Sequence, residues 1–277
     1  MRFTPTSLAV ALGLSLSTAL TANAQTKPTA EVTLTRLQDC GTSAAPTDVG
    51  ARFSDTYAYN GLTVQLVFSC YLIKHGDDYM LWDTGHAMTA GAVAPKITLI
   101  DQLAKLDIKP EQIKFVGISH YHADHTGQVA SFPNSTLLIG KGDWDSINSA
   151  TPIPGTNVAP FGHWKSGAGK LEALAADKDV FGDGTIVILN TPGHTPGHHS
   201  ILLRLKDTGN VLITGDLTHF HENYESNGVP SFNTHRGDTL AALDRFKKIA
   251  ANLKATVIIQ HDARDVSKLP VFPVAAK

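Results

Sequence analysis

The sequence predicts a single α/β domain, and three observations lead to that fold class. The chain has 277 residues with 42% hydrophobic content, enough to bury a full core without a second domain. Short apolar runs that favour β-structure recur along it, and several end directly at a polar, histidine-containing group. Residues 238–253 instead repeat apolar side chains at helical spacing, which predicts a helix on an outer face.

The first 24 residues are typical of a signal peptide. Arg2 supplies a short positive start, residues 8–20 are apolar, and Ala22-Asn23-Ala24 fits cleavage after a small residue. We therefore expect residues 25–277 to form the mature protein as one domain, in the periplasm or outside the cell. An uncleaved anchor is the alternative, and no later stretch is long and apolar enough to span a bilayer.

The first half of the mature chain is expected to contain strands, a hairpin and one helix. Runs of β-forming residues predict five strands, at 31–35, 62–74, 79–82, 115–118 and 136–139. A turn at 75–78, which includes His75, joins the second strand to the third as a hairpin. Leucines at helical spacing predict a helix over 97–106.

The second half returns to strands after a loop. Residues 150–169 are rich in Pro and Gly, which predicts a loop over a site rather than a linker, because strands resume beyond it. Its aromatic residues Phe161 and Trp164 either line a substrate cleft or pack against the core. Three strands follow, at 186–189, 211–213 and 257–259, and Asp238 can cap the helix over 238–253.

The segment from Ser119 to Gly127 is the strongest functional signal. It places His120, His122, Asp124 and His125 directly after the apolar strand 115–118. Side chains alternate along an extended chain, so His120 and His122 can point the same way and share one ion. Asp124 and His125 lie just beyond and turn toward a second ion. Imidazole and carboxylate suit zinc and its neighbours. The alternative is a histidine-rich surface loop that binds metals without selectivity.

A two-metal site needs more ligands than this segment holds, and three later strand ends offer them. His194 follows strand 186–189 in a Thr-Pro-Gly-His sequence, and Gly215-Asp216 follows strand 211–213. His261 follows strand 257–259. Loops at strand ends are where α/β sheets present functional groups. Four strand ends that all offer ligands are hard to obtain by chance.

The order of these groups resembles the metallo-β-lactamase superfamily from about residue 71 to residue 262. That resemblance implies an α/β four-layer αββα sandwich, the metallo-β-lactamase fold. It also implies seven ligands: His120, His122 and His194 for one ion, Asp124, His125 and His261 for the other, and Asp216 as the bridge. Residues 81–86 are similar to the first motif of that superfamily, which implies that Asp83 is buried beneath the metals.

Within the superfamily, residues 191–200 and Glu222-Asn223-Tyr224-Glu225 resemble the N-acyl homoserine lactonases. The resemblance implies opening of N-acyl homoserine lactones, with quorum quenching as its biological outcome. Those enzymes usually place a tyrosine three residues after the bridging aspartate, at the substrate carbonyl, whereas this chain has His219. We predict that His219 donates a hydrogen bond to that carbonyl. The alternative is that it packs beside the site or points to solvent.

The expected chemistry needs no protein nucleophile. Two divalent ions that share a water lower its pKa, and the resulting bridging hydroxide attacks the lactone carbonyl. Asp124 can pass the proton to the leaving oxygen. Zinc is the expected metal, with cobalt, manganese and iron as alternatives. The sequence contains no Gly-x-Ser-x-Gly motif, so a serine esterase has no support.

Other reactions stay open on the same ligand set. The first alternative is hydrolysis of organophosphate triesters or aryl esters, as in enzymes that resemble methyl parathion hydrolase. β-Lactam hydrolysis is disfavoured because true metallo-β-lactamases generally lack a bridging residue like Asp216. A glyoxalase II activity is disfavoured because the tail after Asp262 leaves no room for the usual extra helices. A non-enzymatic metal site is also disfavoured, since structural zinc sites are usually closed, four-ligand and rich in cysteine.

The net charge and the cysteine content limit which molecules the protein can bind and in which cellular compartment it is expected. The formal net charge is −2, and one unit more negative once Arg2 is removed, which gives no electrostatic footprint for nucleic acid. We therefore expect a small-molecule lactone or ester as partner and no membrane span after signal removal, with the oligomeric state left open. The two cysteines, Cys40 and Cys70, predict one disulfide in an oxidising compartment, with two buried thiols as the alternative.

Overall fold

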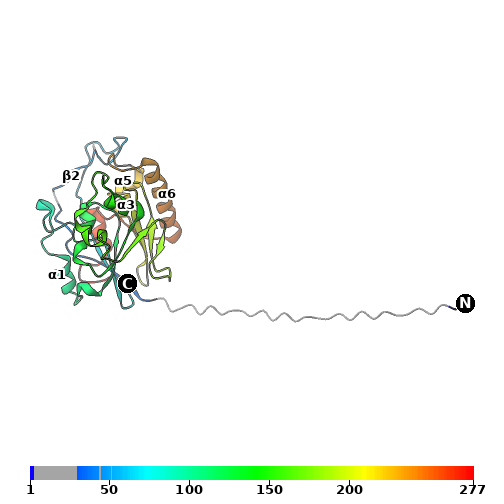
Figure 1. Ribbon diagram of the computed structural model, residues 1–277. Coiled ribbons are helices and arrows are strands. Elements are labelled where there is room, and N and C mark those ends of the chain that lie inside the picture. The colour runs from blue at the N-terminus through cyan, green and yellow to red at the C-terminus, as the bar shows by residue number, and fades with distance from the viewer. Residues whose placement is uncertain (3–29, 44, 51) are drawn as a thin grey trace.

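The computed structural model describes residues 1–2, 30–43, 45–50 and 52–277 (Figure 1). The predicted signal peptide, residues 1–24, lies outside the described residues except for Met1 and Arg2. The domain boundary after residue 24 therefore stays a prediction. Among the helices of the described residues, none has the length and apolar character that crossing a membrane requires.

The first sheet presents the ends of several parallel strands at one edge. It has six strands in the order β1 (Val32–Arg36), β4 (Tyr71–His75), β5 (Asp78–Trp82), β6 (Ile113–Ile118), β7 (Thr136–Gly140) and β8 (Leu171–Leu174). β1, β4 and β5 pair antiparallel, whereas β5 to β8 run parallel. The residues that follow β5, β6 and β7 therefore meet at the same edge of the sheet.

The second sheet lies behind the first and has five strands. Their order is β13 (Thr256–Ile258), β12 (Gly209–Ile213), β11 (His199–Leu205), β10 (Ile186–Asn190) and β9 (Lys178–Asp179). β12 and β13 are parallel, so the residues after both strands emerge at one edge. A separate two-stranded sheet joins β2 (Thr47–Asp48) to β3 (Thr63–Val64).

Helices cover the outer faces of both sheets. The α-helices are α1 (Leu99–Ala104), α2 (Ala123–Thr126), α3 (Lys141–Asn148), α4 (Gly162–Lys165), α5 (His221–Ser226) and α6 (Arg236–Leu253). The 3₁₀ turns are η1 (Gly91–Val93), η2 (Pro110–Gln112), η3 (Val129–Ser131), η4 (Ala159–Phe161), η5 (Gly215–Leu217) and η6 (Ala263–Lys268). In Figure 1, α6 and α1 lie on opposite sides of the molecule.

Three apolar clusters show that these elements form four layers. Side chains such as Tyr71, Trp82 and Ile201 fill the space between the two sheets. One outer cluster joins α1, α3 and α4 to the first sheet, and the other joins α6 to the second sheet. The predicted α/β four-layer αββα sandwich is therefore confirmed, and burial of each sheet on both faces explains why its strands are so apolar.

Most of the predicted elements are present, but the run 62–74 is not one strand. β3 covers two residues of it and β4 begins only at Tyr71. Between them, Leu66 forms a bridge to Asp262, and the backbone N–H of Val67 donates to the carbonyl of His261 at 2.9 Å. This stretch is therefore extended because it pairs with the loop after β13. The β-preference of its residues does not distinguish an extended loop of this kind from a strand of a sheet.

Three smaller predictions are corrected or decided by the structure. His75 ends strand β4 rather than lying in the turn, and its ring stacks on Phe181 with 3.9 Å between ring centroids. The helix α6 begins earlier than predicted, and His235 caps it by accepting a hydrogen bond from the N–H of Asp238 at 3.0 Å. Phe161 and Trp164 are buried in the outer core and do not line the main pocket, so the packing interpretation holds.

The predicted disulfide between Cys40 and Cys70 is present. The two Cα atoms lie 5.9 Å apart, and both residues are buried in the outer core of the first sheet. The bridge ties the segment after β1 to the start of β4 across a sequence separation of 30 residues.

Candidate metal centre

The predicted ligands meet in the cleft between the ends of the two sheets. Each of them follows a strand, namely β6, β10, β12 or β13, and all of these strands end at this edge. The ligand atoms fall into two groups, within each of which all atoms lie within 4.8 Å of one another: His120, His122, His194 and Asp216, and Asp124, His125 and His261. The structure therefore brings together all seven residues that the sequence singles out.

The first group contains three imidazoles that converge from both sheets. The Nδ1 atom of His122 lies 2.8 Å from Nε2 of His120 and 3.0 Å from Nε2 of His194. The Oδ2 atom of Asp216 lies 3.4 Å from Nε2 of His194. Three nitrogens and one carboxylate oxygen at such distances form the kind of donor set that a divalent first-row metal accepts.

The second group is one carboxylate and two imidazoles. The Oδ2 atom of Asp124 lies 3.5 Å from Nε2 of His125 and 3.6 Å from Nε2 of His261. The two imidazole Nε2 atoms lie 3.2 Å apart. Asp124 is partly exposed in the pocket, whereas both histidines are buried.

Asp216 lies between the two groups. Its Oδ2 atom faces the first group, while Oδ1 lies 2.9 Å from Nε2 of His261 and 3.1 Å from Nε2 of His125. Although Oδ1 is buried, it has no hydrogen bond among the described residues. A buried carboxylate oxygen without a hydrogen bond is costly, so the arrangement fits a cation better than an empty cluster. The residues present therefore fit two divalent metals.

Asp83 lies buried beneath this centre, as the resemblance implies. Its carboxylate accepts hydrogen bonds from the N–H of Ser119 and from Nε2 of Gln260, each at 2.7 Å, and lies 2.7 Å from Nδ1 of His125. With Nδ1 held in this way, His125 turns its Nε2 atom toward the site. Contacts of this kind fix the tautomer and orientation of a metal-binding imidazole.

Polar groups also orient three further candidate ligands, namely His194, His261 and Asp216. Nδ1 of His194 lies 2.8 Å from Oδ1 of Asn233, and Nδ1 of His261 donates to the carbonyl of Val67 at 2.7 Å. The backbone N–H of Asp216 donates to Nε2 of His198 at 2.9 Å. His198 therefore supports the site without entering it, and it immediately precedes β11.

The charge state of the imidazoles follows from burial and from Asp216. Burial holds the pKa of His120 and His194 well below the usual value, which keeps both neutral and able to bind a metal. For His125, burial is again the largest effect and acts in the same direction, but the carboxylates of Asp216, Asp124 and Asp83 together outweigh it and raise the pKa. Burial also disfavours ionised Asp216, yet the neighbouring His261 and His125 lower its pKa well below its usual range. Asp216 is thus ionised.

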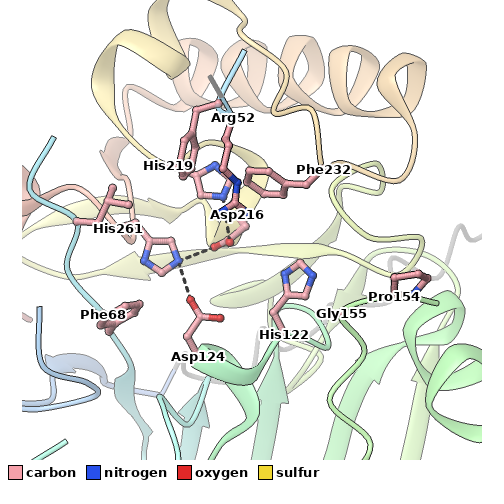
Figure 2. A pocket seen from close by; sticks show the side chains of 12 residues that line it. Arg52, Phe68, His122, Asp124, Pro154, Gly155, Asp216, His219, Phe232 and His261 are labelled. Carbon is pink, nitrogen blue, oxygen red and sulfur yellow. Dashed lines mark ion pairs between the residues drawn. The ribbon is translucent and has the colours of Figure 1, made fainter. Parts of the chain in front are cut away.

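A pocket of about 500 Å³ opens over the centre (Figure 2). Apolar side chains form much of its wall: Phe53, Leu66, Phe68, Pro154 and Phe232. His122, Asp124, Asp216 and His261 form its polar floor. A small molecule with one hydrolysable polar group and an apolar chain matches this division of the surface.

His219 lines the pocket next to Asp216. Its Nε2 atom lies 3.1 Å from Oδ2 of Asp216, and its backbone N–H donates to Oδ1 of Asn223 at 3.0 Å. Its Nδ1 atom is buried and has no partner among the described residues. Edge contacts from Phe53 and Phe232 hold the ring, with centroids 5.0 and 5.7 Å away. His219 does not point to solvent, because it is only 4% exposed.

Sequence reasoning missed several residues that shape the site. Asn233 and Gln260 carry no motif, and nothing in the local pattern separates them from ordinary loop residues. Arg52 lines the pocket from a segment with no predicted role. Asp143 follows the end of strand β7, so the search for polar residues after strand ends, which marked the ligands, could have found it as well. Glu222 turns out to pair with Arg264, away from the pocket.

Comparison with known proteins identifies relatives of this chain. Residues 66–261 match the family described as the metallo-beta-lactamase superfamily. The chain is 32% identical over 223 residues to the N-acyl homoserine lactonase AttM of Rhizobium radiobacter, an alignment that covers 73% of this chain and 84% of that protein. It is 27% identical over 230 residues to an N-acyl homoserine lactonase of Bacillus cereus, which covers 77% of this chain and 88% of the relative.

Solved structures share the fold. An N-acyl homoserine lactone hydrolase with the product N-hexanoyl-L-homoserine bound at its catalytic metal center aligns with a TM-score of 0.73 at 22% identity, over 89% of this chain and 99% of that chain. AidC, described as a dizinc quorum-quenching lactonase, aligns with a TM-score of 0.65 at 19% identity, over 90% and 91% of the two chains. At these identities the likeness shows the fold.

Proposed function

Because the chain belongs to the metallo-beta-lactamase superfamily, we propose that it is a metal-dependent hydrolase that opens the ring of N-acyl homoserine lactones. The observation that carries this proposal is the position of Asp216, which joins two groups of ligands at the floor of an apolar-walled pocket. Lactonase relatives that align with most of this chain support the choice of substrate. The biological outcome of this reaction is quorum quenching.

Two divalent metals fit the donor set, and we propose zinc as the native one. Imidazole and carboxylate ligands suit zinc, with cobalt, manganese or iron as alternatives. We propose that His120, His122 and His194 hold one ion, that Asp124, His125 and His261 hold the other, and that Asp216 serves both. When bound, two such ions supply an activated water as nucleophile and polarise the carbonyl of the substrate.

Two side chains at the pocket have proposed roles in the reaction. Burial opposes ionisation of Asp124, but His125 and His261 beside it hold its pKa well below the usual range. It is therefore ionised, and its partly exposed carboxylate can accept a proton and deliver it to the leaving ring oxygen. His219 lies across the pocket floor next to Asp216, where we propose that it donates a hydrogen bond to the carbonyl oxygen as negative charge develops there.

We also propose that residues 25–277 act as one hydrolase domain in the periplasm or outside the cell. The buried disulfide between Cys40 and Cys70 supports an oxidising compartment. The signal-like composition of residues 1–24 supports export in the same way.

The test compares three substrates on the metal-loaded mature protein. The rates for N-hexanoyl homoserine lactone, paraoxon and nitrocefin are measured side by side, and we expect kcat/KM to be highest for the lactone. Treatment with a chelator should abolish the lactone activity, and added zinc, cobalt or manganese should restore it. If paraoxon, or an aryl ester measured in the same way, is the best substrate by a wide margin, the protein is a phosphotriester or aryl-ester hydrolase instead.

A further inference from the structure

One polar side chain in the pocket, that of Arg52, has no hydrogen-bond or ion-pair partner among the described residues. Six polar residues line the pocket in the described part of the chain: Arg52, His122, Asp124, Asp216, His219 and His261. Four of them are candidate metal ligands, and His219 lies beside Asp216. The guanidinium of Arg52, by contrast, makes no hydrogen bond or ion pair with any described residue, so its donors are free.

Arg52 is nevertheless held in place above the candidate metal centre. Its guanidinium carbon lies 5.2 Å from the centroid of the Phe232 ring, a cation–π contact. The Phe232 ring is in turn 5.8 Å from that of His194 and 5.7 Å from that of His219. Figure 2 shows Arg52 reaching down between His219 and Phe232. Because the Phe232 ring has no oxygen or nitrogen acceptor, this contact leaves the N–H donors of the guanidinium available to a ligand.

The backbone of Arg52 is fixed independently of its side chain. Its carbonyl accepts hydrogen bonds from the N–H of Ser231 at 2.8 Å and from the hydroxyl of Ser231 at 3.2 Å. These bonds tie the segment before Phe53 to the segment that carries Phe232. A substitution of the Arg52 side chain therefore leaves this attachment intact, which makes the residue suitable for a clean test.

We propose that Arg52 determines specificity by donating hydrogen bonds to the amide oxygen of an acylamino lactone. On such a substrate the amide is attached to the ring carbon next to the carbonyl that reacts. With that carbonyl at the pocket floor, the amide oxygen lies a few bonds away, where the side walls of Leu66, Phe68 and Pro154 offer no donor. The free donors of Arg52 fill this gap, so the pocket selects lactones that carry an amide.

The experiment compares Arg52→Met with the wild type on two lactones, and it rests on the lactone activity proposed above. One is N-hexanoyl homoserine lactone, and the other is a γ-butyrolactone with an alkyl chain of matched length on the same ring carbon but no amide. We expect KM for the acylamino lactone to rise about tenfold in the variant while kcat stays unchanged, because the amide does not take part in the reaction. Both constants for the amide-free lactone should stay unchanged.

A second variant, Arg236→Met, tests whether the effect of Arg52→Met comes from a contact with the substrate or merely from the loss of one positive charge. Arg236→Met removes an arginine that forms an ion pair with Asp55 and does not line the pocket. It should leave the ratio of kcat/KM for the two lactones as in the wild type. Three results would overturn the proposal. The ratio of kcat/KM could change equally in both variants, kcat could fall on both lactones in Arg52→Met, or the kinetic constants of Arg52→Met could equal those of the wild type.

A binding measurement tests the role of Arg52 independently of the proposed lactone activity. Calorimetric titration of the metal-loaded protein with ring-opened N-hexanoyl homoserine, and with the matched hydroxy acid that lacks the amide, requires no turnover. We expect Arg52→Met to weaken binding of the first about tenfold and to leave binding of the second unchanged. If the wild type opens neither lactone, the proposed function fails, but this titration still decides the role of Arg52.

Discussion

The carboxylate of Asp143 accepts a hydrogen bond from the backbone N–H of Gly197 at 2.7 Å, and this bond joins α3 to the loop after β10, which carries His194. The same carboxylate accepts from the N–H of Tyr121 at 2.9 Å and from the hydroxyl of Thr195 at 2.8 Å. Tyr121 lies between two of the proposed ligands, and Thr195 follows a third. One buried side chain on α3 therefore sets the distance between the loop after β6 and the loop after β10.

Replacement of Asp143 by Asn should weaken metal binding more than folding. The amide keeps the volume of the carboxylate but has one acceptor oxygen where the carboxylate has two, so it cannot hold both loops equally well. Loss of a contact that orients metal ligands typically lowers metal affinity about 10- to 100-fold. Competition with a chromogenic chelator measures this affinity.

The control for Asp143 is Asp145→Asn on the same helix. Asp145 is exposed and forms an ion pair with Lys141, so its loss should leave zinc affinity unchanged. Thermal unfolding of the metal-free proteins completes the comparison. If Asp143→Asn lowers the Tm of the metal-free protein strongly while zinc affinity stays at the wild-type value, the residue is a structural one only.

Asp216→Ala should release one of two metals before it unfolds the protein. The carboxylate lies within reach of both ligand groups and offsets the repulsion between two dications. Elemental analysis after gel filtration should find about two zinc ions per wild-type chain and about one in the variant. A wild type that holds a single metal even in excess zinc contradicts the two-metal assignment.

The fold and much of the site could be predicted because their signals are local. His120 to His125 are contiguous, and Asp216 and His261 each follow an apolar strand, so spacing alone marks them. Asn233 and Gln260 could not be predicted in this way. Asn233 lies 39 residues from the His194 ring that it orients, and Gln260 lies 177 residues from Asp83. Only the folded chain creates such contacts.

The disulfide should contribute measurably to stability. A bridge across a separation of 30 residues stabilises by roughly 3 to 4 kcal/mol in the chain-entropy model, because it restricts the unfolded chain. The free energy of unfolding in urea should fall by about this amount in the double variant Cys40→Ser/Cys70→Ser. Two free thiols titrated in the denatured, oxidised wild type would show that the bridge does not form.

Acid stability should depend on Asp183, far from the metal centre. Partial burial opposes its ionisation, but hydrogen bonds from Thr185 and from His75 lower its pKa to about 2. Because the folded value lies below that of the unfolded chain, this carboxylate stabilises the protein above pH 4 or so, and the contribution is lost as the pH falls toward 2. Metal-free wild type should therefore be more stable than Asp183→Asn at pH 6. A stability difference that persists unchanged at pH 2 would contradict this assignment.

His219 is expected to act as a hydrogen-bond donor to the substrate carbonyl. Replacement by Phe keeps the ring between Phe53 and Phe232 but removes both nitrogens. Removal of one donor that acts mainly in the transition state typically costs about 10²-fold in turnover, so kcat for the best lactone should fall by about that factor. Metal content must be measured alongside, since Nε2 of His219 lies 3.1 Å from Asp216.

Replacement of His219 by Tyr tests whether His219 acts by donating a hydrogen bond to the substrate or by supporting metal binding through Asp216. A phenol restores a donor at the position where the lactonases usually carry a tyrosine, so His219→Tyr should recover most of the turnover that His219→Phe loses. If His219→Phe keeps both metals and wild-type turnover, the histidine donates nothing to the reaction, and polarisation of the carbonyl then needs no help from this side chain.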